Sequence, residues 1–235
     1  MNEIKYPTIV LFDMDGTTVR HINPRLLHLA EFLDDFTFNI SQFFSRFRFR
    51  KARVTHGRRR IRPKLIVHRA LHKIRRKSVE QIVEPCDGIY DVLDYLKGKN
   101  IPMGIVSNGL GKGYGHDILA RFDMEKYFLG QVFVEDITRS KPNPEPLFLA
   151  LEKMGLKPQA QDVVWYVGDR KKDILAALAA QQELPCTVEA FAYGLDASFT
   201  ILEKSLSPDR IFYSLLDMEL LLQELEAEKS AAVPA

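Results

Sequence analysis

Three short apolar runs, each leading into a polar residue, constrain the fold of this chain more than any other feature. The runs are residues 8–13, 101–106 and 163–167. They lead into Asp13, Ser107 and Asp169. Short apolar runs bounded by turn residues are typical of strands buried on both faces of a parallel sheet. Because the carboxyl ends of parallel strands share one edge, these polar residues are expected to converge.

Segments with apolar residues at helical spacing separate the runs and complete the pattern. Helices are predicted at about 89–98, 117–122, 143–154, 172–180 and 215–228, and further strands at 132–134, 187–191 and 211–212. Strands that alternate with helices predict an α/β fold with a doubly wound parallel sheet. The glycine run at 109–115 lacks the spacing of either phosphate-loop motif, which favours a loop there.

The segment from about 17 to 84 is too long for one crossover between strands. It is interpreted as an inserted small α-helical cap, with helices beginning near Asn23-Pro24 and at Pro63. The predicted division is a core of residues 1–20 and 85–235 and a cap of residues 21–84.

Four carboxylates are expected at the shared edge of the sheet: Asp13, Asp15, Asp169 and Asp173. At about 4 Å and an effective dielectric of about 20, each pair of them repels by roughly 4 kcal/mol. A cation is therefore required, and oxygen ligands without clustered Cys or His favour Mg²⁺ over zinc. Lys141 can add a fixed positive charge.

The turn after the second run suits an anionic oxygen. Ser107 and the backbone N–H groups of Asn108 and Gly109 can hold such an oxygen at the start of a loop or helix. Together with carboxylates, magnesium and a lysine, this set suits phosphoryl transfer. A carboxylate is ionised at pH 7 and can attack phosphorus without a helper base.

Four motifs in these positions resemble those of the haloacid-dehalogenase-like (HAD) phosphatases. They are Asp13-Met14-Asp15-Gly16-Thr17, Ser107-Asn108-Gly109, Lys141-Pro142 and the run from Gly168 to Asp173. They occur in the family order, each at a predicted element end. The resemblance covers residues 7–20 and 85 to about 217 and is strongest to phosphoglycolate-phosphatase-like members with a helical cap. It implies a HAD-like Rossmannoid core. Arg170 departs from the small hydroxyl residue that many members have there.

The resemblance implies roles for the residues of the first two motifs. Asp13 would be the nucleophile and a Mg²⁺ ligand. Asp15 would be the general acid/base and would lend its backbone carbonyl to the metal. Ser107, with Asn108 and Gly109, would bind the phosphoryl oxygens. An acid at position 15 resembles the phosphatases and phosphomutases rather than the dehalogenases, which lack it.

The last two motifs complete the implied site. Lys141 would neutralise the nucleophile and the phosphate, Asp169 would ligate Mg²⁺ directly, and Asp173 would act on the metal or through its waters. The implied activity is Mg-dependent hydrolysis of a phosphate monoester through an aspartyl-phosphate on Asp13. A phosphomutase or phosphotransferase of the same family is the alternative.

The formal net charge of +2 conceals two opposite charges. Residues 36–79 contain fifteen Lys or Arg and no Asp or Glu, whereas eighteen basic and thirty-one acidic residues stand outside them, a charge of −13. Such a split indicates an anionic substrate or partner. Three roles for the basic residues at 46–77 stay open: a solvated cap that attracts anionic substrates, contact with an anionic lipid surface, or contact with nucleic acid.

Other classes of protein are disfavoured by the sequence. No apolar run approaches the roughly 18 residues of a membrane span, and none has the form of a signal peptide core. The two cysteines, Cys86 and Cys186, lack metal-ligand spacing and are expected to be reduced thiols. A cytoplasmic location is the expectation.

Overall fold

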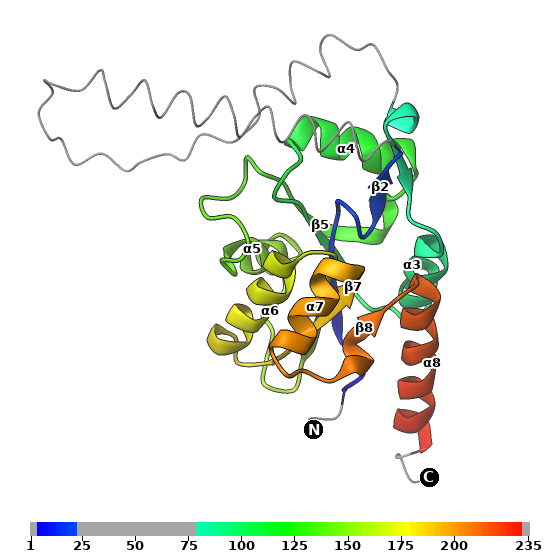
Figure 1. Cartoon of the computed structure of the whole chain (residues 1–235), viewed down its shortest axis with the longest axis vertical. Coiled ribbons are helices and arrows are strands. Elements are labelled where there is room, and N and C mark those ends of the chain that lie inside the picture. Colours follow the sequence, from blue (N-terminus) through cyan, green and yellow to red (C-terminus); the bar gives the residue numbers. More distant parts are fainter. Residues whose placement is uncertain (1–3, 23–78, 232–235) are drawn as a thin grey trace, which may run out of the picture. The chain divides into compact units, whose positions relative to one another are not determined.

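The computed structural model describes residues 4–22 and 79–231, which contain a six-stranded parallel sheet with helices on its faces (Figure 1). The strands of this sheet are β1 (Ile9–Asp13), β4 (Met103–Val106), β5 (Phe128–Val132), β6 (Val163–Gly168), β7 (Thr187–Tyr193) and β8 (Ile211–Phe212). The helices are α3 (Ile89–Gly98), α4 (Lys112–Arg121), α5 (Glu145–Lys153), α6 (Lys171–Glu183), α7 (Leu195–Glu203) and α8 (Leu215–Ala231). The predicted α/β fold class is confirmed.

The strand order has a switch point at β1, where the side of the sheet on which successive strands are added changes. The strands lie in the order β5-β4-β1-β6-β7-β8. The chain therefore adds β4 and β5 on one side of β1, and then adds β6, β7 and β8 on the other side. Asp13 pairs with Val106 of β4, and Phe12 pairs with Val167 of β6. Ligands of open parallel sheets bind outside the carboxyl ends of the strands at such a switch point. The topology therefore marks the ends of β1, β4 and β6.

Alternation of side chains divides the core between the two faces of the sheet. Ile9 and Leu11 join one buried cluster to which α5, α6 and α7 contribute residues such as Leu147, Ile174 and Ile201. The ring of Phe191 contacts the rings of Trp165 and Phe212. The strand neighbours of these three residues belong to the first cluster, so the three rings lie on the other face of the sheet. Helices α3 and α8 pack on each other away from α5, α6 and α7 (Figure 1).

Two of the local predictions are wrong. The strand predicted at 132–134 is β5 at Phe128–Val132, because the ladder to β4 continues through the polar positions Gly130 and Gln131. The loop predicted at 109–115 is only partly a loop, because α4 already begins at Lys112. Gly115 of this run allows close packing, because a Cβ at its position would collide with the ring of Phe133.

Several further elements were not predicted. They include helix α7 and the paired strands β2 (Val19–His21) and β3 (Val83–Pro85). These segments lack a sustained pattern of apolar residues from which they could be predicted. Within residues 4–22 and 79–231, the short 3₁₀ helices are η1 (Val79–Gln81), η2 (Glu125–Tyr127) and η3 (Pro208–Arg210). Of the helices in the described part of the chain, none combines the length and the apolar character needed to cross a membrane.

The chain divides into two compact units. One comprises Met1–Arg20 with Glu84–Ala235, and the other comprises His21–Val83. The helices predicted near Asn23-Pro24 and Pro63, and the basic residues at 46–77, lie outside the described residues. The helical cap at 21–84 stays a prediction.

Two glycines of α4 provide a matched test of this packing. A Cβ on Gly115 would lie 2.0 Å from the Phe133 ring, whereas a Cβ on Gly113 would have nothing within 4 Å. We expect Gly115→Ala to lower the free energy of unfolding by about 1–3 kcal/mol through overpacking. Gly113→Ala should raise it by about 0.5–1 kcal/mol, because alanine loses less backbone entropy in a helix. Equilibrium urea denaturation measures both, and a stable Gly115→Ala would contradict the packing.

Candidate active site

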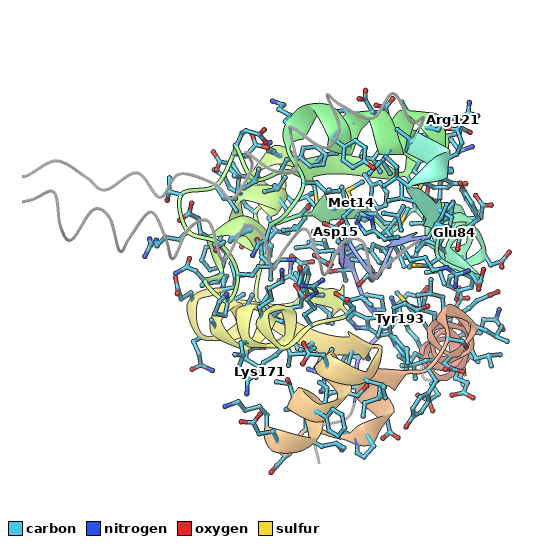
Figure 2. The ribbon with its side chains drawn as sticks, turned by 45° about the horizontal axis from the view of Figure 1, so that its top comes forward. Met14, Asp15, Glu84, Arg121, Lys171 and Tyr193 are labelled. Carbon is cyan, nitrogen blue, oxygen red and sulfur yellow. The ribbon has the colours of Figure 1, made fainter. Side chains whose placement is uncertain are left out.

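The turn after β1 is held rigidly by backbone hydrogen bonds. The Met14 N–H donates to the carbonyl of Val106 at 3.2 Å, and the N–H groups of Thr18 and Val19 both donate to the carbonyl of Met14. The Thr18 hydroxyl donates to the carbonyl of Asp13 at 2.8 Å. These bonds fix the main chain that carries Asp13 and Asp15. Figure 2 shows Met14 and Asp15 in the middle of the view, between α4 and α6.

Gly16 allows the loops after β1 and β6 to touch. Its φ is +91°, and a Cβ at this position would lie only 2.2 Å from Oδ2 of Asp169. Any other residue would be strained by this backbone conformation and would displace the Asp169 carboxylate. The glycine therefore brings the first and fourth motifs into direct contact.

The turn after β4 places Ser107 against Asp15. The Ser107 hydroxyl donates to Oδ2 of Asp15 at 3.0 Å, and its oxygen accepts the N–H groups of Gly109 and Leu110. The Asn108 side-chain amide donates to the carbonyl of Lys141 at 3.3 Å. The first, second and third motifs are thus joined by direct hydrogen bonds.

Lys141 is the buried cation of the site. Its side chain is 0% exposed, and its ammonium forms ion pairs with Asp13 and, at 2.7 Å, with Asp173. Burial acts to lower the pKa of Lys141, but its neighbours, Asp13 first and then Tyr166 and Asp173, outweigh it and raise this pKa well above its usual value. The ammonium form is therefore favoured, and the cation compensates part of the buried negative charge.

Asp173 also organises the start of α6. Its Oδ2 accepts the N–H of Arg170 at 3.0 Å, while its Oδ1 faces Lys141. An acidic residue in the first turn of a helix is favoured by the exposed N–H groups and by the helix dipole. Both oxygens of Asp173 thus have protein donors, which suits a carboxylate that positions its neighbours.

Asp169 is supported from the opposite side by α7. Its backbone carbonyl accepts the N–H of Ala197 at 3.1 Å, and Asp196 of the same helix accepts the N–H of Lys171 at 3.0 Å. Helix α7, which was not predicted, therefore fixes the loop that presents the Asp169 carboxylate. Figure 2 shows Lys171 at the start of α6, in the same region.

The carboxylates of Asp13, Asp169 and Asp173 fit a hard divalent cation. One oxygen from each lies within 4.8 Å of the others, and every donor of the set is a carboxylate oxygen. Oδ1 of Asp169 is buried and has no hydrogen-bond partner among the described residues. A buried carboxylate oxygen without a donor is costly unless a cation satisfies it. Oxygen-only donors of this kind suit Mg²⁺.

Titration properties agree with a site that needs a cation. Burial raises the pKa of Asp13 well above its usual value, and the neighbouring carboxylates act in the same direction against Lys141. Burial, followed by the Asp173 carboxylate, raises the pKa of Asp169 to about 7. Perturbed carboxylates that meet at a sheet edge are typical of functional sites.

Comparison with known sequences identifies the family. Residues 10–184, more than half of the chain, match the sequence model of the haloacid dehalogenase-like hydrolases. The chain belongs to the haloacid dehalogenase-like hydrolase family. The matched stretch contains all four motifs.

Curated relatives of this HAD chain include phosphatases. The phosphoglycolate phosphatase of Escherichia coli K12 is 34% identical over 131 residues, which cover 55% of this chain and 48% of the relative. The pyrophosphatase PpaX of Oceanobacillus iheyensis is 31% identical over 130 residues, which cover 55% of this chain and 56% of the relative. The chain spans about half the length of the curated relatives it matches.

Solved structures of HAD proteins share the fold. A HAD-superfamily hydrolase from Ehrlichia chaffeensis has a TM-score of 0.59 and 21% identity, covering 95% of this chain and 99% of that chain. A family IA HAD hydrolase from Entamoeba histolytica has a TM-score of 0.56 and 17% identity, and the likeness covers 93% of this chain and 99% of that chain. At these identities the likeness concerns the fold.

One polar member of the site was not predicted from the sequence. Tyr166 of β6 is fully buried, and its hydroxyl accepts a hydrogen bond from the Lys141 ammonium at 2.8 Å. The available signal was a tyrosine inside an otherwise apolar strand next to Gly168-Asp169, because a buried phenol needs a hydrogen-bond partner. Its partner could not be identified from spacing.

Arg170, which departs from the usual small hydroxyl residue of the family, lies against a predicted metal ligand. Its Nε is 3.8 Å from Oδ2 of Asp169, and its side chain is 39% exposed. Removing this cation should tighten Mg²⁺ binding, but only by about two- to five-fold, because half-exposed ion pairs contribute less than about 1 kcal/mol. We expect this for Arg170→Ala in calorimetric titration with MgCl₂.

Lys171→Ala is the matched control for this titration. It removes the same unit charge, but the Lys171 ammonium pairs with Glu203 of α7 at 2.8 Å. Mg²⁺ affinity should change less in this variant. Equal tightening in both variants would assign the effect to net charge rather than to the position of Arg170.

Proposed function

We propose that this HAD protein is a magnesium-dependent phosphatase that hydrolyses a phosphate monoester through an aspartyl-phosphate on Asp13. The observation that carries the proposal is the convergence at one sheet edge of Asp13, Asp15 and Lys141 with the carboxylates of Asp169 and Asp173. The phosphatase names of the curated relatives support the same activity.

In the first step, a carboxylate oxygen of Asp13 attacks phosphorus and the bond from phosphorus to the ester oxygen breaks. Lys141 pairs with Oδ1 of Asp13 and so restricts the orientation of the nucleophile. Asp15 donates a proton to the leaving oxygen, which departs as an alcohol. Ser107, whose hydroxyl donates a hydrogen bond to Asp15, would bind the phosphoryl oxygens together with Asn108 and Gly109.

In the second step, Asp15 accepts a proton from a water molecule that attacks phosphorus. The bond between phosphorus and Asp13 breaks, inorganic phosphate leaves, and the Asp13 carboxylate is restored. One residue serves as acid and then as base because it is left ionised after the first step. The position of Asp15 beside Ser107 supports this assignment.

Asp13 and Asp169, with the backbone carbonyl of Asp15, would hold Mg²⁺, and Asp173 would act on the metal or through its waters. When bound, Mg²⁺ would neutralise charge on the phosphoryl oxygens and bring the anionic substrate close to the carboxylates. Lys141 is fully buried and pairs with Asp13, and its contact with phosphate stays a prediction.

Substitution of the two aspartates separates the two steps. With Mg²⁺ and 4-nitrophenyl phosphate, Asp13→Asn should lose activity by at least about 10³-fold, because the nucleophile is absent. Asp15→Asn should still form the acyl phosphate, because nitrophenolate leaves without protonation, but should hydrolyse it slowly. Intact-protein mass spectrometry should then show an added phosphoryl group in Asp15→Asn and none in Asp13→Asn. Magnesium-dependent turnover by Asp13→Asn would contradict the proposed mechanism.

A phosphomutase or phosphotransferase of the same family is the alternative, because the same acid at position 15 can deliver the phosphoryl group to a second hydroxyl. Incubation with a sugar phosphate discriminates the two. Release of inorganic phosphate supports the phosphatase, whereas transfer between two hydroxyls with little release supports the mutase.

The basic residues at 46–77 add a proposal about partners. Their charge of +15 within residues 36–79, beside −13 elsewhere, favours attraction of an anion. The simplest role is to draw a small phosphorylated substrate towards the core. Contact with an anionic lipid surface and contact with nucleic acid are the two alternatives.

Salt dependence tests this electrostatic role. The rate constant kcat/KM for a small phosphate ester should fall as NaCl rises from about 50 to 500 mM, because screening shortens the reach of the charges. Sedimentation with phosphatidylserine vesicles, and fluorescence anisotropy with a labelled oligonucleotide, test the alternatives in the same series. Retention on either that does not weaken with salt would contradict an electrostatic contact.

A further inference from the structure

The hydroxyl of Tyr166 lies inside the site without a part in the two chemical steps. The residue is in β6, three positions before Asp169, and its side chain is completely buried. The hydroxyl accepts a hydrogen bond from Lys141 Nζ at 2.8 Å and donates one to Oδ1 of Asp173 at 3.3 Å.

The hydroxyl completes the surroundings of the Lys141 ammonium. An ammonium has three protons to donate, and three polar partners surround this one: Asp13 and Tyr166 accept hydrogen bonds from it, and Asp173 forms an ion pair with it at 2.7 Å. They come from β1, α6 and β6, which are separate parts of the core. Without the hydroxyl, the buried ammonium would keep only the hydrogen bond to Asp13 and the ion pair with Asp173, and it could rotate about its last bond.

We propose that Tyr166 is a positioning residue of the reaction, whose hydroxyl holds the Lys141 ammonium between Asp13 and Asp173. The proposal rests on the proposed function, in which Asp13 attacks phosphorus. Lys141 pairs with one oxygen of Asp13 and thereby sets the orientation of the other. A loosened ammonium would leave substrate binding largely intact, because Tyr166 is buried and Ser107 stays in place, but would misalign the nucleophile.

Tyr166→Phe tests the proposal by removing a single oxygen atom. With Mg²⁺ and 4-nitrophenyl phosphate, kcat should fall on the order of ten-fold while KM changes by less than about two-fold, as expected for lost alignment. Tyr127→Phe is the matched control, because the Tyr127 hydroxyl donates to a carboxylate of another part of the core, Oδ1 of Asp94, at 2.6 Å. Its kcat should equal that of the wild type. A fall of kcat shared by both variants, or an unchanged kcat in Tyr166→Phe, would overturn the proposal.

A second readout does not depend on activity. The ¹⁵Nζ resonance of Lys141, assigned by its loss in Lys141→Arg, should show slowly exchanging protons in the wild type and faster exchange in Tyr166→Phe. In the wild type, a nuclear Overhauser effect should connect these protons with the ring of Tyr166. Absence of that contact would overturn the proposal even if Tyr166→Phe does not fold. If the wild type lacks phosphatase activity, the proposed function fails, while the resonance still reports whether Tyr166 holds Lys141.

Discussion

The ion pairs of the Lys141 ammonium with Asp13 and Asp173 connect the parts of this site. Carboxylates that follow different strands repel one another at a shared sheet edge, and burial strengthens the repulsion because water no longer screens it. The buried ammonium offsets part of that charge. A divalent cation at Asp13 and Asp169 would offset the remainder, which explains why the described core contains one unpartnered carboxylate oxygen, on Asp169.

The sheet topology brings the residues of this site together. Because β1 lies between β4 and β6, the residues that end β1, follow β4 and follow β6 meet although they are far apart in sequence. Close approach then depends on Gly16, where a side chain would collide with Asp169. Membership in the haloacid dehalogenase-like family agrees with this construction.

Much of the core was predictable from the sequence because strands buried on both faces leave short apolar runs with distinct ends. The runs before Asp13, Ser107 and Asp169 were placed in this way. Helix α7 was missed, because its apolar residues lie on two sides: Ala197 and Ile201 are buried, whereas Phe199 is 69% exposed. The strand at 132–134 was misplaced, because Gly130 and Gln131 interrupt the apolar pattern of β5 although their backbone continues the ladder.

The sequence by itself determined the fold class, the order of the four motifs and the chemical types available for phosphoryl transfer, because these depend on local patterns. Only the tertiary structure decided which groups touch. It pairs Lys141 with two carboxylates, sets Arg170 against Asp169 and inserts the Tyr166 hydroxyl among them. Such contacts join residues up to 128 positions apart, and their distances follow from the register of the sheet and the packing of α6 and α7 rather than from spacing along the chain.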